Sequence, residues 1–204
     1  MKKLIGSLTM AVALAVMVFS VSAVAQGSGS KMKDSMGMAP SFSALDHNGK
    51  QHSLEDYRGK VVVLEWLNPG CPFVQRHYRE GTFKGLAEQY GERGVVWLAV
   101  NSTSGNDAEV SRKWAQQHDL PYPILVDKSS QVAKLYDAKT TPHMFVVGRS
   151  GELVYQGAVD DDPNGTKESR THYARLAIEA ALVGSAPDMR ETKPYGCAVK
   201  YASN

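Results

Sequence analysis

Two uninterrupted apolar runs constrain the fold of this chain more than any other feature of its sequence. Residues 60–67 (KVVVLEWL) and 94–100 (GVVWLAV) are rich in β-branched side chains, and each run is long enough for a strand buried inside a sheet. Between them, residues 72–90 have helical character, with an expected interruption near Gly81 and Gly85. Strands that alternate with helices predict an α/β domain with a central mixed sheet and helices on both of its faces.

Shorter segments complete the predicted sheet and its helices. Residues 41–45 and 51–54 flank Asp46-His47-Asn48-Gly49, and an Asn-Gly turn between short alternating runs predicts an N-terminal β-hairpin. A second antiparallel hairpin is expected from residues 143–147 and 153–159. A short strand is predicted at residues 122–126. Three further helices are predicted at residues 107–118, 130–136 and 168–183.

The first 25 residues have the pattern of an export signal. Lys2 and Lys3 precede an apolar stretch over residues 4–19, and Ala23-Val24-Ala25 provides the small residues of a cleavage site. This pattern predicts a cleaved signal peptide over residues 1–25. The alternative is an uncleaved leader that anchors the chain in a membrane, since the apolar stretch is nearly long enough to span one. Either reading predicts that the remainder is periplasmic or secreted.

The charge of the chain argues against nucleic acid as a partner. The sequence has 23 Lys and Arg against 21 Asp and Glu, and the two surplus cations, Lys2 and Lys3, both lie in the predicted leader. The rest of the chain is therefore neutral in formal charge and has no cationic surplus that would attract nucleic acid or anionic lipid. We expect no nucleic-acid partner, and membrane attachment only through an uncleaved leader.

Three further parts are expected after the leader. Residues 26–39 contain Gly, Ser, Lys and Met without a helical or strand period, which predicts a flexible linker. Residues 40–187 are the predicted folded domain, and residues 188–204 form a C-terminal tail that carries Cys197.

Cys71 lies between the strand that is expected to end near Leu67 and the helix that Pro72 opens. At such an N-cap position, unpaired backbone N–H groups and the positive end of the helix dipole stabilise a thiolate, which lowers the pKa of a thiol from about 8.5. Because the thiolate is the reactive form, Cys71 is the candidate catalytic nucleophile. A packed cysteine or one end of a structural disulfide is the alternative.

Three segments of the chain carry a family resemblance: PSFSALDHNGKQHSLEDYRGK, VVVLEWLNPGCPFV and TTPHMF. They resemble the thioredoxin-fold superfamily, in particular its peroxiredoxin-like or redoxin (AhpC/TSA-type) branch, over about residues 40–183. The resemblance implies a three-layer thioredoxin-like fold with an N-terminal β-hairpin. It also implies that Thr141-Pro142 is the cis-proline element that faces the active cysteine and presents backbone groups to a substrate, with Pro69 and Gly70 on the same substrate-binding surface.

The chain departs from both catalytic patterns of this superfamily. Thioredoxins use C-x-x-C, whereas this chain has N-x-x-C, with Asn68 in the first position. Peroxiredoxins use P-x-x-x-T-x-x-C, and here Leu64 and Asn68 stand where the proline and threonine would be, while the peroxiredoxin arginine would fall at Pro142. Asn68 both donates and accepts hydrogen bonds. It is therefore a candidate for orienting a peroxide or polarising a sulfur atom.

Glu65 is a charged residue inside an otherwise apolar strand, six positions before Cys71. A partly buried carboxylate at this place is a candidate for moving protons to and from the thiol. The alternative is a carboxylate exposed at the rim of the strand.

Cys197 is the second thiol of the chain, and its role stays open at this point. Without a C-x-x-C partner, an oxidised Cys71 requires Cys197, an outside thiol or a second subunit to resolve it. Tyr195, Val199 and Tyr201 flank Cys197 and are expected to anchor the tail. The alternative is a permanent bridge, which would close a loop of about 127 residues and stabilise the fold by about 5 kcal/mol in the chain-entropy model. An even number of cysteines in an exported chain permits both.

These features predict an exported thiol-dependent oxidoreductase that needs no cofactor. Its reaction is expected to be thiol–disulfide exchange or peroxiredoxin-like, antioxidant peroxide reduction. The expected partners are an external thiol or disulfide protein that reduces or oxidises it, and a peroxide or a protein disulfide as substrate. The alternative is an extracytoplasmic copper-binding or purely structural thioredoxin-fold module. The soft ligands that Cu(I) prefers would come from two groups, Met32, Met36 and Met38, and Cys71, Cys197 and His143.

Overall fold

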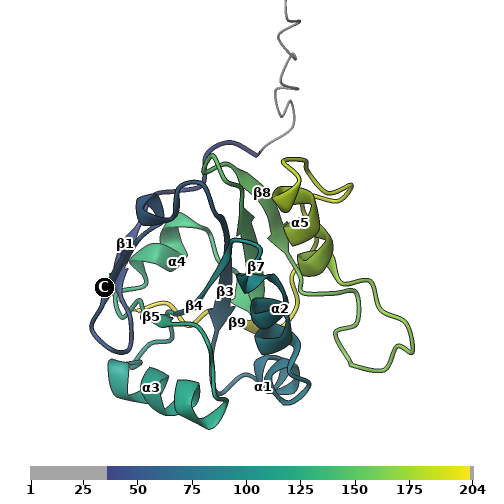
Figure 1. The fold of residues 1–204 in the computed structure, drawn as a ribbon. Helices are drawn as coiled ribbons and strands as arrows, with labels where there is room; N and C mark the ends of the chain where they lie inside the picture. Colours follow the sequence, from purple (N-terminus) through teal and green to yellow (C-terminus); the bar gives the residue numbers. More distant parts are fainter. Residues whose placement is uncertain (1–35, 203–204) are drawn as a thin grey trace, which may run out of the picture. The chain divides into compact units, whose positions relative to one another are not determined.

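A five-stranded mixed sheet lies at the centre of the computed structural model, which describes residues 36–202 (Figure 1). The strand order is β5–β4–β3–β7–β8. β3 is parallel to β4, and β4 to β5, whereas β7 is antiparallel to both β3 and β8. The strands are β3 (Val61–Leu67), β4 (Val95–Asn101), β5 (Ile124–Val126), β7 (His143–Val147) and β8 (Leu153–Gly157). The predicted central mixed sheet is thus confirmed.

The predicted signal peptide and most of the predicted linker lie outside the described residues. The last residues of that linker are hydrogen-bonded to the domain: the backbone N–H of Met36 donates to Leu153, and that of Ala39 donates to Gly151. Within residues 36–202, we find no helix with the length and apolar character needed to cross a membrane.

Two smaller pairs of strands flank the central sheet. β1 (Ser43–Leu45) and β2 (Gln51–Ser53) form the predicted N-terminal hairpin, and the Asp46 carboxylate accepts hydrogen bonds from two backbone N–H groups of its turn. β6 (Thr140–Thr141) pairs antiparallel with β9 (Cys197–Ala198). This second pairing joins the C-terminal tail to the residues immediately before Pro142, and no pattern in the sequence predicted it.

Side chains of the central strands alternate between two apolar cores, one on each face of the sheet. Along β3, Val61, Val63 and Leu67 belong to one core, and its even-numbered neighbours belong to the other. The first core is covered by α1 (Pro72–Arg79), α2 (Thr82–Gly91), α3 (Ala108–Gln117) and α5 (Tyr173–Leu182). The second is covered by α4 (Gln131–Leu135), the hairpin and the short 3-10 helix η1 (Leu54–Tyr57). A strand buried on both faces explains the uninterrupted apolar runs.

The predicted helix over residues 72–90 is divided into α1 and α2. Gly81 has a φ of +69°, in the left-handed region, and a residue in this conformation cannot continue a right-handed helix. Gly85 lies within α2 and does not interrupt it.

The last helix begins at Tyr173 and not near Glu168, so its predicted start was about one turn too early. The Asp162 carboxylate accepts hydrogen bonds from the backbone N–H groups of Thr166 and Lys167. A side chain therefore binds the backbone donors of this segment in a loop conformation, which competes with helix formation.

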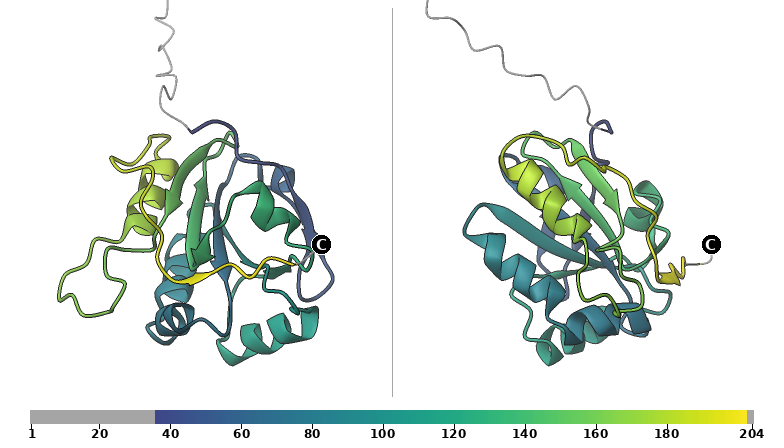
Figure 2. Two further views of the ribbon diagram at one scale, coloured as in Figure 1. Left: turned by 180° about the vertical axis from the view of Figure 1, so that it is seen from behind. Right: turned by 90° about the vertical axis from the view of Figure 1, so that its right-hand side faces the viewer.

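The C-terminal tail crosses the end of the sheet, as the yellow ribbon in the left view of Figure 2 shows. Its three predicted anchors all contact the domain: Tyr195 bonds to Asp160, Val199 to Lys139 and Tyr201 to Ala138. The expectation that these residues hold the tail in place is confirmed.

The packing of Phe145 on β7 provides a test of the fold. Its fully buried ring lies 5.0 Å from the ring of Trp66 and 5.2 Å from that of Tyr136, measured between centroids. Phe145→Ala removes these contacts and leaves a cavity, so we expect the free energy of unfolding to fall by about 3–5 kcal/mol in urea titrations followed by tryptophan fluorescence. Val183→Ala, at a residue 76% exposed, is the control and should change it by no more than about 0.5 kcal/mol. Equal effects of the two substitutions would contradict the described core.

Candidate active site

Cys71 is the N-cap residue of α1, with Pro72 in the first turn of the helix. Its side chain is fully buried, and its thiol donates a hydrogen bond to the carbonyl oxygen of Thr141 at 2.9 Å. The backbone N–H of Cys71 donates to the Asn68 carbonyl at 2.9 Å, which closes the turn between β3 and α1. The strand, turn and helix thus place the sulfur at the end of α1 where backbone N–H groups are unpaired.

Hydrogen-bond donors converge on the Cys71 sulfur from three separate segments. Burial is the largest influence and on its own raises the pKa of Cys71. It is outweighed by hydrogen bonds from the Cys197 thiol, the Val74 backbone N–H, the Thr141 side chain and the Cys197 backbone N–H, so that the pKa of Cys71 lies below its ordinary value. Each of these donors favours the thiolate over the thiol.

Cys197 reaches this sulfur because β9 pairs with β6. In their register Cys197 lies opposite Thr141, and Ala198 lies opposite Thr140. Both cysteines are free thiols. Burial, the hydrogen bond to Cys71 and the nearby negative charge of its thiolate raise the pKa of Cys197 to about 11. The pair therefore combines an ionisable thiol at Cys71 with a protonated thiol at Cys197.

The Thr141-Pro142 peptide bond is cis, as the family resemblance implied. Thr141 is buried, and its carbonyl and side chain both contact the Cys71 sulfur. The side-chain hydroxyl of Thr140 donates instead to the Pro142 carbonyl at 3.0 Å. The Thr141 hydroxyl donates to the Cys197 carbonyl at 3.5 Å and also approaches the Cys71 sulfur.

Asn68 shapes the turn that carries Cys71. Its side-chain oxygen accepts a hydrogen bond from the Gly70 backbone N–H at 2.8 Å, so this oxygen is engaged within the loop. The Pro69 carbonyl accepts a hydrogen bond from the Gln75 side chain at 2.9 Å. Pro69 is partly exposed and Gly70 is exposed, which leaves these two residues at the accessible rim beside the buried cysteine.

Glu65 is fully buried, so the alternative of an exposed carboxylate at the strand rim is wrong. It accepts a hydrogen bond from the Trp97 indole at 2.9 Å, and the hydroxyls of Tyr78 and Tyr122 also approach it. Neither hydroxyl nor the second carboxyl oxygen has a partner in regular hydrogen-bond geometry. Burial raises the pKa of Glu65 to about 8, although these three neighbours lower it. The carboxyl group therefore gains and loses its proton close to neutral pH.

Tyr195 is a residue at the site whose partners the sequence did not reveal. Its hydroxyl donates to the Asp160 carboxylate at 2.5 Å and accepts from the Arg76 guanidinium at 3.2 Å. The Nε2 atom of His77 lies 2.9 Å from the same oxygen. These partners come from α1 and from a distant loop. In the sequence, the only sign that Tyr195 belongs to the site was its position two residues before Cys197, in the triplet Tyr-Gly-Cys.

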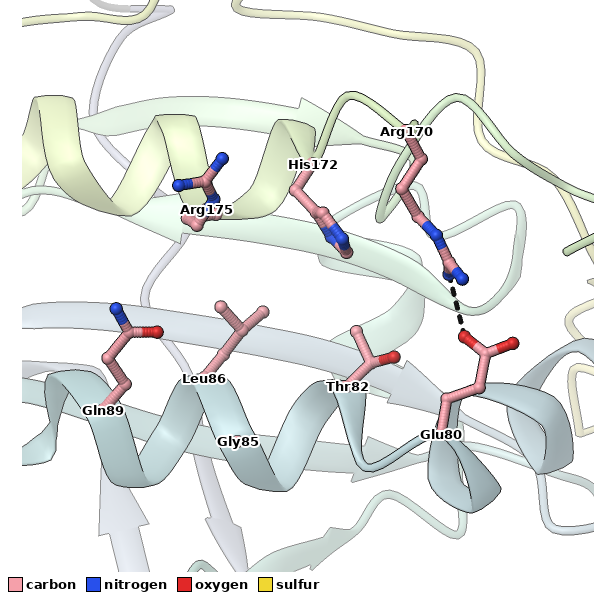
Figure 3. Close-up of a pocket in the computed structure, with 8 residues that line it drawn as sticks. All are labelled: Glu80, Thr82, Gly85, Leu86, Gln89, Arg170, His172 and Arg175. Atoms are coloured by element: carbon pink, nitrogen blue, oxygen red, sulfur yellow. Dashed lines mark hydrogen bonds and ion pairs between the residues drawn. The ribbon is translucent and has the colours of Figure 1, made fainter. Parts of the chain in front are cut away.

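A separate groove of about 480 Å³ lies between α2 and the beginning of α5 (Figure 3). At one end of it, Arg170 and Glu80 form an ion pair at 2.8 Å. Arg175 and His172 line the α5 side. Cys71 does not line this groove. The thiol thus lies under the tail, not at the base of this hollow.

The copper alternative gains no support from the His and Cys side chains that the structure describes. Among residues 36–202, we find no group of three or more His, Cys, Asp or Glu side chains arranged to hold a metal ion. His143 is buried and its Nδ1 accepts a hydrogen bond from the Lys139 backbone N–H at 3.2 Å. Met32 lies outside the described residues.

Comparison with known proteins gives matches in sequence and in fold. A model of the AhpC/TSA family matches residues 37–156. The thiol-disulfide oxidoreductase ResA of Geobacillus kaustophilus is 33% identical over 115 residues, which are 56% of this chain and 64% of that protein. The match therefore spans less than two thirds of this curated relative.

Two solved structures are similar to this chain in fold. An uncharacterized conserved protein from Geobacillus kaustophilus is 29% identical with a TM-score of 0.76, and the match covers 85% of this chain and 95% of that one. A putative thioredoxin from Neisseria meningitidis is 26% identical with a TM-score of 0.53, covering 60% and 79%. The thioredoxin-like fold is thus confirmed, and the first structure shares parts of this chain beyond the thioredoxin core.

The hydroxyl of Thr141 provides a test of how the thiolate is stabilised. Thr141→Val removes this donor with little change of shape, so we expect the pKa of Cys71 to rise. The pH dependence of Cys71 alkylation by iodoacetamide, followed by peptide mass mapping, measures it. Thr140→Val is the matched control, because the Thr140 hydroxyl bonds to Pro142 instead. If both variants titrate like the unchanged protein, Thr141 has no part in stabilising the thiolate.

The burial of Glu65 predicts a pH-dependent stability. Its pKa in the folded chain, about 8, lies above its ordinary value of 4.5. Between these two values the unfolded chain loses a proton that the folded chain retains, so stability present at low pH is lost as pH rises, by about 1.4 kcal/mol per pH unit. Urea unfolding from pH 5 to 8 should show this loss relative to Glu65→Gln, which cannot ionise. Glu92→Gln, at an exposed position, should keep the slope of the unchanged protein. A wild-type curve parallel to that of Glu65→Gln would refute the assignment.

Proposed function

Because this chain belongs to the AhpC/TSA family, we propose that it is a thiol-dependent oxidoreductase that performs thiol–disulfide exchange with Cys71 as its nucleophile. The observation that carries the proposal is the surroundings of the Cys71 sulfur, where a helix N-terminus, the Thr141 side chain and the tail all direct donors to one atom. The printed name of the ResA relative, a thiol-disulfide oxidoreductase, supports the same reaction.

The first step is an attack of the Cys71 thiolate on one sulfur of a substrate disulfide. A new S–S bond joins Cys71 to that sulfur, and the other substrate sulfur leaves with the electron pair of the broken bond and takes up a proton. The low pKa of Cys71 increases the fraction of the reactive thiolate. The buried site keeps the attacking sulfur away from bulk water until the substrate arrives.

Cys197 is the resolving thiol in the second step. It loses its proton and attacks the Cys71 sulfur, which forms the Cys71–Cys197 disulfide and releases the second substrate thiol. Two thiols have then been oxidised and one substrate disulfide reduced. The pairing of β9 with β6 keeps the two cysteines adjacent, which makes this step intramolecular and therefore fast.

The disulfide that results is reduced again by an external dithiol protein, which supplies the two electrons for the next cycle. In the opposite direction, an oxidised partner would convert the two cysteines to a disulfide, and a substrate dithiol would reduce that disulfide again. The leader pattern supports a location outside the cytoplasm, in the periplasm or the medium, where both directions of exchange have partners.

The remaining predicted site residues have distinct roles in this proposal. Thr141 and Pro142, with the partly exposed Pro69 and the exposed Gly70, form the surface against which the substrate lies. Asn68 holds the turn through its hydrogen bond to Gly70, and it acts as a positioning residue for Cys71.

Glu65 is proposed to exchange protons with the thiol pair. It lies on the same face of β3 as Val63 and Leu67, and this is the face that α1 covers. A carboxyl group with a pKa near 8 accepts and returns a proton at neutral pH, which the deprotonation of Cys197 requires.

A peroxide is the second candidate substrate, and the complete burial of Cys71 favours it. Hydrogen peroxide needs far less opening of the site than a protein disulfide. The thiolate would attack one peroxide oxygen and become a sulfenic acid while the other oxygen leaves as water after protonation. Attack by Cys197 on the sulfenic sulfur would then form the disulfide and release a second water.

Substitution of each cysteine separates the two proposed steps. Cys71→Ser should abolish the reaction with the disulfide reagent DTNB, because no activated thiolate remains. Cys197→Ser should react but stop at the mixed disulfide on Cys71, detected as an added mass that persists until an external thiol is supplied. Parallel assays with hydrogen peroxide distinguish the two substrate classes. If Cys71→Ser reacts at the unchanged rate, or if neither oxidant reacts with the unchanged protein, the proposed function is wrong.

A further inference from the structure

Tyr195 lies on one face of α1, the helix that has Cys71 at its N-terminus. Its ring packs against that of Phe73 with 5.9 Å between the centroids. Its hydroxyl oxygen lies 3.2 Å from the Arg76 guanidinium and 2.9 Å from the Nε2 atom of His77. These three α1 residues have the spacing i, i+3 and i+4, so they share one side of the helix. The tail is therefore fixed to the helix that holds the nucleophile, two residues before its own thiol.

Charged groups hold the Tyr195 hydroxyl. It donates to the Asp160 carboxylate at 2.5 Å and accepts from the Arg76 guanidinium. Asp160 is buried, and its carboxylate also contacts the Arg170 guanidinium at 3.4 Å and accepts from the Asp162 backbone N–H at 3.0 Å. Hydrogen bonds to charged groups are about twice as strong as neutral ones. The anchor of the tail at Tyr195 therefore rests on a buried acceptor that is itself fixed.

Gly196 is the single residue between this anchor and Cys197. It lies directly against the Thr141 carbonyl, since a Cβ atom added to it would lie 2.1 Å from that oxygen. The same oxygen accepts the hydrogen bond of the Cys71 thiol. The pair of β6 and β9 contains two residues of each strand, and a glycine before it leaves the backbone free to turn in other directions. The position of Cys197 therefore depends on the anchor at Tyr195 as well as on the strand pair.

We propose that Tyr195 is a positioning residue for the resolving step, because its anchored hydroxyl holds Cys197 where it can attack a mixed disulfide on Cys71. Tyr195 acts through Cys197 and does not itself react. Holding one thiol beside another raises its effective concentration, which accelerates disulfide closure. This inference rests on the proposed function, in which Cys197 is the resolving thiol. Without the anchor, the mixed disulfide would still form at Cys71 but would close slowly.

The reaction with DTNB separates the two steps in time. In the first step, the Cys71 thiolate attacks one sulfur of DTNB, and one coloured thionitrobenzoate leaves with the electron pair of the broken bond. In the second step, Cys197 loses its proton and attacks the Cys71 sulfur, which forms the Cys71–Cys197 disulfide and releases a second thionitrobenzoate. The second release is intramolecular, so its rate constant is independent of the DTNB concentration. This rate constant is the quantity that the anchor should control.

Tyr195→Phe keeps the ring and removes the hydroxyl. We expect the rate constant of the second release to fall about tenfold or more, as the loss of a hydrogen bond to a charged group implies, while the first release is not slowed. Tyr90→Phe is the matched control and should change neither release. The Tyr90 hydroxyl also donates to a carboxylate, that of Glu179 at 2.6 Å, but it does so between α2 and α5. Asp160→Asn weakens the Tyr195 bond from the acceptor's side and serves if Tyr195→Phe fails to fold.

The reduction potential of the Cys71–Cys197 pair is a second readout, which a loss of overall stability would not move. A lower effective concentration of Cys197 makes the disulfide easier to reduce, so the potential of Tyr195→Phe should be less negative. A tenfold fall in effective concentration corresponds to about 30 mV. Equilibration with reduced and oxidised glutathione measures it, and Tyr90→Phe should keep the potential of the unchanged protein.

An unchanged second release in Tyr195→Phe, or in Asp160→Asn where the former does not fold, would overturn the positioning role and leave the proposed function intact. The same holds if both releases slow equally, since Tyr195 would then support the whole site and not Cys197. If the unchanged protein releases no thionitrobenzoate, the proposed function itself fails. The release measurements therefore distinguish the two failures.

Discussion

The need to stabilise a negative charge on a fully buried sulfur is the constraint on which the rest of this structure depends. Removing a thiolate from water is unfavourable, and only directed donors offset that cost. A short turn joins β3 to α1, so that a backbone N–H of the first helical turn faces Cys71. β6 provides the Thr141 side chain, and β9 provides two further donors from Cys197. The connections of the fold therefore converge on one atom, and each contributes a group that the others cannot supply.

A comparison of Cys71 with Glu65 shows that burial alone does not decide which form of an acid a protein favours. Both residues are fully buried. At Cys71 the donors outweigh burial and lower the pKa, whereas at Glu65 the indole of Trp97 and two tyrosines fail to do so and the pKa is raised. The surroundings thereby favour the ionised form of Cys71 and the protonated form of Glu65. An acid and a base suited to proton exchange result from the number and geometry of donors.

The parts of the fold that depend on neighbouring residues were predictable, and those that depend on long-range pairing were not. Apolar periodicity located the central strands, and Cys71-Pro72 identified a helix N-terminus, because each signal is local. The register of β9 on β6 depends on contacts between segments far apart, and two residues of tail contain no period that could reveal it. For Glu65 the sequence predicted at most a partly buried carboxylate. Its complete burial depends on Trp97, Tyr78 and Tyr122, which come from three other segments.

The C-terminal tail creates an opposition between activation of the Cys71 thiol and access to it. Cys197 lends its backbone N–H and thiol to the Cys71 sulfur, and the same segment covers that sulfur completely. Movement of Cys197 away from β6 would expose the thiolate and at the same moment remove two of its donors. The position of the tail that best stabilises the thiolate is therefore the one that gives a substrate least access to it.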